Sequence, residues 1–228
     1  MYRVALLYSA LLVLLTPLQS YANDASKITV AVSEIPSLLS ESADAQGSYN
    51  QILTQLSNDI DVIFMPPARL EVEFPAKKYV ECIFPASLQN IISQTPLIAS
   101  DPVDKVSAFV FSKNGLTMDN IEPETKIAIR RGFTVGHVRK KLSATYIELN
   151  SDIETAQFLS LGRVDAVIAY LPDFVGAHEE LSLPIPVYAK DSPVYEAVDS
   201  FVCRRSPETE SFLQNANKVI KAYKQTAQ

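Results

Sequence analysis

Two neighbouring arginines precede a glycine in the middle of the chain, in a setting that could bind an anion. Arg131 is followed by Gly132, whose missing side chain lets the backbone approach a ligand closely. The amides of Phe133 and Thr134, with the Thr134 hydroxyl, could complete the site, because turns that open helices present free amide donors. A guanidinium can hold a carboxylate or phosphate through two parallel hydrogen bonds. We therefore expect Arg131 to bind ligand, and Arg130 to point to the opposite face and be solvated.

Five further residues follow the ends of apolar, strand-like runs, where ligand-binding side chains often lie. Arg69 follows two prolines at a helix start, where a cation is unfavourable to the helix dipole, which indicates some other reason for it. Glu34 could contact an ammonium group, and Tyr170 could stack on a ligand or form a hydrogen bond with it. A solvated position is the alternative for Arg69 and Glu34, and plain packing is the alternative for Tyr170. Ser87 and Asp173 complete the set of candidate ligand-binding residues.

Neither metal binding nor catalysis has a recognisable residue pattern in this sequence. His178 stands beside two glutamates without a second histidine at ligand spacing, and His137 lies in a basic, helix-like stretch. The sequence has no glycine-flanked serine elbow and no phosphate loop, and neither cysteine is placed with a histidine. We therefore expect no metal, no cofactor and no catalytic residue.

The N-terminal residues predict a cleaved signal peptide over residues 1–22. Arg3 supplies a positive charge, Val4 to Leu15 form an apolar run, and Ser20 to Ala22 place small residues at the −3 and −1 positions of a cleavage site. A membrane anchor is the alternative, but a helix over this run would reach only about 18 Å, short of the ~30 Å hydrocarbon core. We expect export to the periplasm.

Composition narrows the possible partners of the remaining chain. The full sequence carries 26 Asp plus Glu against 20 Lys plus Arg, a net charge of −6. It has no long basic run and no interleaving of basic and aromatic residues, so we do not expect nucleic acid to bind. Cys82 and Cys203 are the only cysteines. In an exported chain this count favours one disulfide, and two buried thiols are the alternative.

Strand-like and helix-like segments alternate along the chain. Strands are expected over Lys27–Val32, Asp61–Met65, Val80–Phe84, Val106–Ser112, Lys126–Ile129, Val164–Tyr170 and Asp199–Arg204. Helices are expected around Ile52–Leu56, Arg69–Lys78, Ser151–Leu161 and Phe212–Tyr223. Ser151 and Glu154 have the spacing of a capping box at the start of one of these helices. The alternation predicts an α/β protein with mostly parallel sheet.

Three segments in order along the chain resemble the type II periplasmic solute-binding proteins, specifically the family of polar-amino-acid binders that serve import transporters. They are Ser100–Val103 with the strand after it, Lys126–Gly132, and Leu161–Ile168. The resemblance covers Lys27 to Tyr223. It implies two lobes, each a mostly parallel sheet flanked by helices, with a ligand cleft between them.

The resemblance also implies how the chain is divided. Lobe 1 would comprise residues 23–106 and 196–228, and lobe 2 would comprise residues 107–195. The two crossovers, near Val106–Phe109 and Val194–Val198, would act as the hinge. In this family the returning strand lies beside the third strand, which places Cys203 next to Cys82 in a disulfide within lobe 1.

The sequence departs from the family at two positions, the one that binds the ligand carboxylate and the one that binds the ligand ammonium group. Ser93 stands where the family generally has an arginine that binds the ligand carboxylate, and Tyr170 stands where it has an aspartate that binds the ammonium group. The usual ligand therefore does not follow from the resemblance. We expect instead an anionic or strongly polar ligand, held by Arg69 from lobe 1 and Arg131 from lobe 2.

The resemblance predicts a monomeric binding protein that presents a small molecule to an inner-membrane transporter or sensor. Two alternatives remain open on the same fold. One is an enzyme of the dehydratase kind, and the other is an interaction module that has lost its ligand. Fold alone does not separate them, because function lies in the site.

Overall fold

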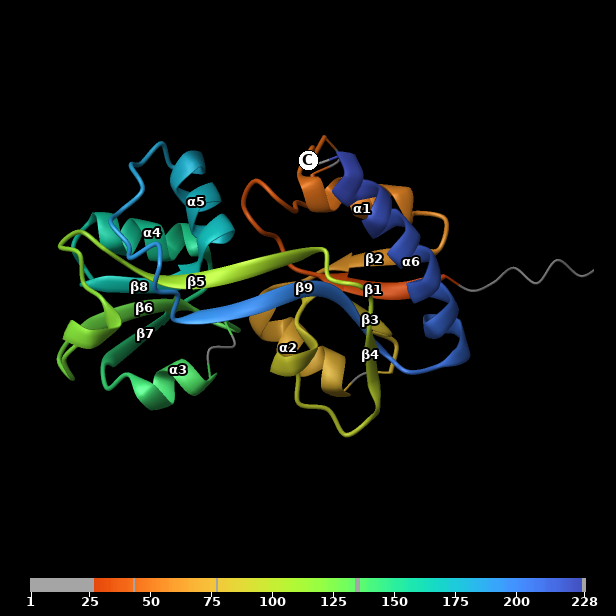
Figure 1. Ribbon diagram of the computed structural model, residues 1–228, viewed down its shortest axis with the longest axis horizontal. Coiled ribbons are helices and arrows are strands. Elements are labelled where there is room, and N and C mark those ends of the chain that lie inside the picture. The colour runs from red at the N-terminus through yellow and green to blue at the C-terminus, as the bar shows by residue number, and fades with distance from the viewer. Residues whose placement is uncertain (1–26, 43, 77, 134–135, 227–228) are drawn as a thin grey trace, which may run out of the picture.

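The computed structural model describes residues 27–42, 44–76, 78–133 and 136–226. The predicted signal peptide and Thr134 lie outside these residues. Within the described part of the chain, no helix is both long and apolar enough to cross a membrane. The elements form two groups at opposite ends of an elongated molecule, and two long strands connect them (Figure 1).

The first group, lobe 1, is built from both ends of the chain. Its elements are β1 (Ile28–Val32), α1 (Ser48–Gln55), β2 (Ile60–Phe64), α2 (Pro67–Ala76), β3 (Cys82–Ala86), the 3-10 turn η1 (Leu88–Asn90), β4 (Leu97–Ala99) and α6 (Pro207–Thr226). Strands β2, β1 and β3 run parallel, as expected where helices connect consecutive strands. Helix α6 packs beside α1 on one face of this sheet (Figure 1).

The second group, lobe 2, follows the same plan. Its elements are the second half of β5 (Asp104–Ser112), the 3-10 turn η2 (Met118–Asn120), β6 (Lys126–Arg130), α3 (Gly136–Lys141), β7 (Thr145–Leu149), α4 (Asp152–Ser160), β8 (Ala166–Tyr170) and α5 (Leu171–Glu180). Strand β6 lies between β7 and β8 and runs parallel to both. Ser151 caps α4 by accepting a hydrogen bond from the Glu154 amide at 3.1 Å, as the capping-box spacing predicts.

Strands β5 and β9 (Tyr195–Arg204) pass side by side from one lobe to the other. Residues 104–108 of β5 pair with residues 195–199 of β9 in an antiparallel ladder. Beyond this ladder, β5 pairs with β8 in lobe 2, while β9 pairs with β3 and β4 in lobe 1. The two lobes therefore share one sheet, whose order is β2-β1-β3-β9-β5-β8-β6-β7.

Each lobe buries apolar side chains on both faces of its sheet, as parallel sheets do. In lobe 1, Val30 and Phe84 face α1 and α6, whereas Ala31 and Ile83 face the side covered by α2. The alternation follows from the two-residue period of a strand. The same division recurs in lobe 2, where Ile127 and Ile129 belong to one apolar cluster and Ala128 to the other.

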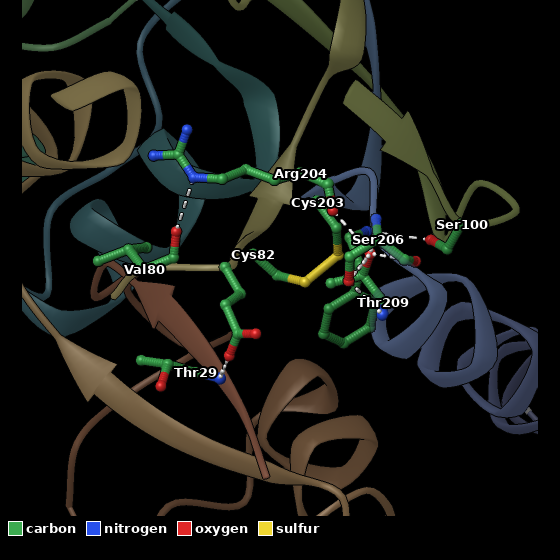
Figure 2. Close-up of a disulfide and its surroundings, with 10 residues drawn as sticks. Thr29, Val80, Cys82, Ser100, Cys203, Arg204, Ser206 and Thr209 are labelled. Carbon is green, nitrogen blue, oxygen red and sulfur yellow. Dashed lines mark hydrogen bonds between the residues drawn. A yellow bond between two sulfur atoms is a disulfide. The ribbon is translucent and has the colours of Figure 1, made fainter. Parts of the chain in front are cut away.

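Cys82 and Cys203 form a disulfide, which confirms the predicted pairing. They are directly opposite each other on β3 and β9, with Cα atoms 4.0 Å apart, and both are fully buried. Figure 2 shows the bond beside the turn of Ser206 and Thr209 that opens α6. The bridge closes a loop that contains all of lobe 2, because 121 positions separate the two cysteines.

Loss of this disulfide is expected to lower the free energy of unfolding by about 2–4 kcal/mol, because the reduced chain gains conformational freedom when unfolded. Urea denaturation of the oxidised wild type and the Cys82→Ala/Cys203→Ala variant measures the difference. Alkylation before and after reduction is the control for the bond itself. Two thiols that react in the unreduced, denatured protein would contradict the pairing.

Candidate functional site

A cavity of about 350 Å³ lies between the two lobes. It is bordered by the residues that follow the carboxyl ends of β1, β3, β6 and β8, where ligands of α/β proteins usually bind. Its apolar wall is formed by Ile35, Pro67, Leu70, Phe74, Pro75, Ile83, Pro85, Ala86, Ile91, Ile92, Val106, Phe133 and Ala197. Its remaining lining residues are Ser33, Glu71, Ser87, Asn90, Arg130, Gly132, Tyr170, Asp173 and Asp199.

Arg130 is the one basic residue among the described residues that line this cavity. It already has two acidic partners. Its Nη1 lies 2.5 Å from Asp152 Oδ2 and 3.4 Å from Asp173 Oδ2. All three side chains are buried, with exposed fractions of 12% for Arg130, 5% for Asp152 and 8% for Asp173. Asp152 and Asp173 stand in the first turns of α4 and α5, where the helix dipole favours a negative charge. The arrangement is a buried ion cluster in the wall of lobe 2.

The prediction that Arg130 is solvated was wrong. Along β6, Arg130 shares a strand face with Ala128, whose apolar cluster is covered by residues of α4 and α5. The two-residue period of the strand therefore directs Arg130 beneath these helices. Arg131 lies one residue further and points away from them.

Asp199 contributes a second acidic group, from the point where β9 passes between the lobes. Its Oδ2 accepts a hydrogen bond from the Tyr49 hydroxyl at 2.6 Å. Burial raises the pKa of Asp199 to about 6; the hydrogen bond from Tyr49 opposes the rise, and the charge of Asp104 adds to it. Burial likewise raises the pKa of Asp173 and outweighs the opposing charge of Arg130. Two carboxyl groups of the cavity thus hold their protons to higher pH than usual.

The stability of the ligand-free protein is expected to fall between pH 4 and pH 7 relative to the Asp199→Asn variant. The pKa of Asp199 is about 6 in the folded protein against an ordinary value of 3.8, so the folded state binds more protons in this interval and is favoured at its acidic end. Thermal denaturation at four pH values measures the difference. Asp119→Asn, at an exposed position, is the matched control. Parallel curves for the wild type and Asp199→Asn would contradict the account.

Two buried polar atoms in the cavity wall have no hydrogen-bond partner among the described residues. They are the hydroxyl oxygen of Ser87 and the Nε of Arg130. Both atoms are covered by the surrounding side chains, so neither is open to the cavity in this arrangement of the lobes.

Five of the nine ligand-binding residues proposed from sequence line the cavity. They are Ser87, Gly132, Phe133, Tyr170 and Asp173. The Phe133 and Tyr170 rings meet edge to face, with centroids 4.7 Å apart. Together they form an aromatic wall on lobe 2.

The other four residues do not line this cavity in the described structure, and the predicted grip by two arginines is corrected. Arg69 is exposed and pairs with Glu73, one helical turn further along α2. Arg131 is exposed and pairs with Glu148 on the neighbouring strand β7. Glu34 accepts a hydrogen bond from the Glu41 amide beside a second hollow, and Thr134 lies outside the described residues. Arg69 thus pairs within its own helix and Arg131 pairs with a neighbouring strand, and neither side chain lines the cavity.

The sequence analysis missed four lining residues whose charged or amide side chains could bind a ligand: Glu71, Asn90, Arg130 and Asp199. The alternation along β6 was a signal for Arg130, because it puts Arg130 on the face of Ala128. Asp199 has no comparable signal, since its place depends on the pairing of β5 with β9.

The two lobes touch each other at two glycines. A Cβ atom on Gly132 would lie 2.8 Å from the backbone nitrogen of Ala68 in α2, and one on Gly176 would lie 2.5 Å from the carbonyl oxygen of Pro36. Real Cβ atoms do not approach backbone so closely, so each glycine admits the backbone of the opposite lobe. Near the second contact, the Ser37 hydroxyl donates to Glu179 at 3.4 Å. The two lobes are therefore in direct contact beside the cavity.

Comparison with known proteins supports the fold. In sequence, the chain matches no protein-family model and no curated protein. In structure, it is similar to the substrate-binding protein of an amino-acid ABC transporter, with a TM-score of 0.65 and 18% identity over 88% of this chain and 94% of the other. The GluR0 ligand-binding core from Nostoc punctiforme, in complex with L-glutamate, has a TM-score of 0.68 at 16% identity over 88% of this chain and 94% of the other.

A third similar structure is the ancestral amino-acid-binding protein AncCDT-1, a precursor of cyclohexadienyl dehydratase. Its TM-score is 0.65 at 15% identity, over 87% of this chain and 90% of the other. These similarities establish that the chain has the two-lobed α/β fold of type II periplasmic binding proteins.

Proposed function

We propose that this protein binds a small molecule between its lobes and carries out no reaction on it. The observation that carries the proposal is the cavity of about 350 Å³, walled by both lobes and by the two crossing strands. This volume lies within the range of small-molecule sites, and its mixture of an apolar wall with a few polar groups is typical of them. The lobe boundaries near residues 106 and 196 are part of the same proposal.

The comparisons support binding rather than catalysis in this fold. The similar structures are described as amino-acid-binding or substrate-binding proteins, and one is a precursor of a dehydratase. We propose that the closed form is presented to an inner-membrane transporter or sensor, with the mature monomer in the periplasm. An enzyme on this fold is the second candidate, favoured by the raised pKa values of Asp173 and Asp199, since perturbed carboxyl groups also occur in active sites.

A thermal-shift screen against amino acids, amines, organic acids and sugars tests the proposal. A ligand at 100 times its Kd adds about 2.7 kcal/mol to stability, which is a clear rise in melting temperature. The Ala86→Phe variant fills the cavity wall and is the control, so a cavity ligand should stabilise the wild type alone. A small-molecule function would be contradicted if no compound raised the melting temperature of the wild type more than that of Ala86→Phe. Turnover of a stabilising compound, followed by mass spectrometry, would favour the enzyme.

A further inference from the structure

The charged groups that line the cavity do not balance. Glu71, Asp173 and Asp199 are acidic, and Arg130 is the single basic residue among the described lining residues. Arg130 has its shortest contact to Asp152, which lies behind it and not in the cavity lining. The Arg130–Asp152 pair is thus close to neutral, and the cavity keeps an excess of carboxylates.

These carboxylates come from different parts of the fold. Asp173 belongs to α5 of lobe 2, Glu71 belongs to α2 of lobe 1, and Asp199 lies on the strand that joins the lobes. Glu71 is the more exposed of the three and stands at the rim. A positive charge placed among them would interact with both lobes at once, and it would do so only when the lobes are closed. Buried carboxylates without a matching cation cost free energy, so such a charge would also stabilise the closed form.

The rest of the cavity offers little to an anion. The Nε of Arg130 is buried and not open to the cavity, and its Nη1 faces Asp152 and Asp173. Arg69 and Arg131 are paired elsewhere, with Glu73 and Glu148. A ligand carboxylate would therefore meet a guanidinium whose charge is already shared by two carboxylates, with Glu71 and Asp199 also in the lining. Like charges in a poorly solvated site repel strongly.

The apolar wall defines the other half of the ligand. Phe133 and Tyr170 present an aromatic corner, and Leu70, Phe74 and Ile83 extend the apolar surface on lobe 1. Aromatic faces also attract cations that lie over them. The cavity therefore suits an apolar or aromatic body with a positive end.

Building on the proposed function, we infer that the ligand is an organic cation, an amine on an apolar or aromatic body, that needs no carboxylate for binding. Its ammonium group is held by Asp173 and Asp199, with Glu71 at the rim, and its body packs against Phe133 and Tyr170. Arg130 then acts as a positioning residue, because it orients Asp173 from behind and does not hold an anionic ligand.

Binding of such a cation is expected to strengthen as the pH rises. The groups around Asp199 are Tyr49 on α1, Asp104 on β5 and Arg130 on β6, and those around Asp173 are Arg130, Asp152 and Asp199. The pKa of Asp199 is raised to about 6, so its charged fraction grows about tenfold between pH 5 and pH 7. A cation that requires this charge gains at least this factor in affinity, because burial also raises the pKa of Asp173, to about 8, and the charge on Asp173 therefore grows over the same interval.

Isothermal titration calorimetry tests the inference with three probes that share a phenylethyl group and differ in their charged groups: 2-phenylethylamine, phenylalanine and 3-phenylpropionate. For the wild-type mature protein at pH 7, we expect the amine to bind at least tenfold more tightly than either carboxylate-bearing probe. Its affinity should rise at least tenfold from pH 5 to pH 7, and Asp199→Asn and Asp173→Asn should each weaken it at least tenfold. Glu34→Gln, a carboxylate outside the cavity, is the matched control and should bind as the wild type does.

The outcomes separate this inference from the proposed function. Tighter binding of phenylalanine or 3-phenylpropionate would overturn the cationic ligand while leaving a binding cavity in place. Equal amine affinity in the wild type and in both aspartate variants would also overturn it, and the melting temperature of each variant shows that it is folded. Both proposals fail if no probe binds and if no compound of the thermal-shift screen stabilises the wild type more than Ala86→Phe. If no probe binds and the screen finds only an acid or a sugar, the cationic ligand alone is refuted. If the screen finds an amine, that amine replaces 2-phenylethylamine in the same series.

Discussion

Replacing Arg130 with methionine is expected to lower the free energy of unfolding by about 3–5 kcal/mol at pH 7. The substitution keeps much of the side-chain volume but leaves Asp152 and Asp173 buried without their shared cation. Breaking a buried ion pair by removing one partner typically costs this much, because the other charge stays desolvated. Urea denaturation at pH 7 measures the change.

The neighbouring residue provides the matched control. Arg131→Met removes the same charge one position along the chain, from a side chain that is 53% exposed. Its effect is expected to lie within about 0.5 kcal/mol, as for most surface substitutions. Adding Asp152→Asn to Arg130→Met should restore part of the lost stability, because it removes one unpaired charge. Equal losses for Arg130→Met and Arg131→Met would contradict the buried cluster.

Replacing Gly176 with alanine is expected to weaken ligand binding at least tenfold without destabilising the ligand-free protein. The added Cβ would lie 2.5 Å from the carbonyl oxygen of Pro36, so the lobes could not close to the arrangement seen here. When the lobes are apart the clash is absent. Gly176 is inside α5, where alanine is favoured over glycine by about 1 kcal/mol.

Titration with the best ligand of the screen and thermal denaturation without ligand measure the two halves of this prediction. Glu180→Ala changes an exposed position of the same helix and should leave affinity unchanged. Normal affinity in Gly176→Ala would show that closure at Pro36 is not needed for binding. A large fall in the melting temperature of the ligand-free variant would show instead that the glycine has a purely structural role.

The fold could be predicted from the sequence because its signals are local and repeated. Apolar runs that end at prolines or glycines marked most of the central strands. The resemblance to the solute-binding family, in which the returning strand lies beside the third strand, placed Cys203 beside Cys82. Helix α5 was missed, since its start at Leu171-Pro172 looked like the end of a strand and not the first turn of a helix. Strand β7 was missed as well, because it is a short edge strand with only partly buried or exposed residues.

The candidate site could be predicted only in part, because it depends on which side chains face inward from each lobe. Tyr170 and Asp173 were identified from their place after a strand. Arg130 and Arg131 were assigned to the wrong faces, because the turn at Gly132 favoured Arg131 as the ligand-binding residue. Asp199 lines the cavity because β9 pairs with β5, a strand far away in the sequence, and no local pattern encodes that contact.

The claim at the centre of this account is that the two lobes close on a ligand in the cavity between them. Small-angle X-ray scattering of the mature wild-type protein, with and without the most stabilising compound of the screen, tests it most directly. Strands β5 and β9 carry the only two backbone connections between the lobes in the described chain, so a rotation there changes the overall shape. We predict a smaller radius of gyration and a shorter maximum dimension in the bound protein. Identical scattering curves with the ligand bound at saturation would contradict closure.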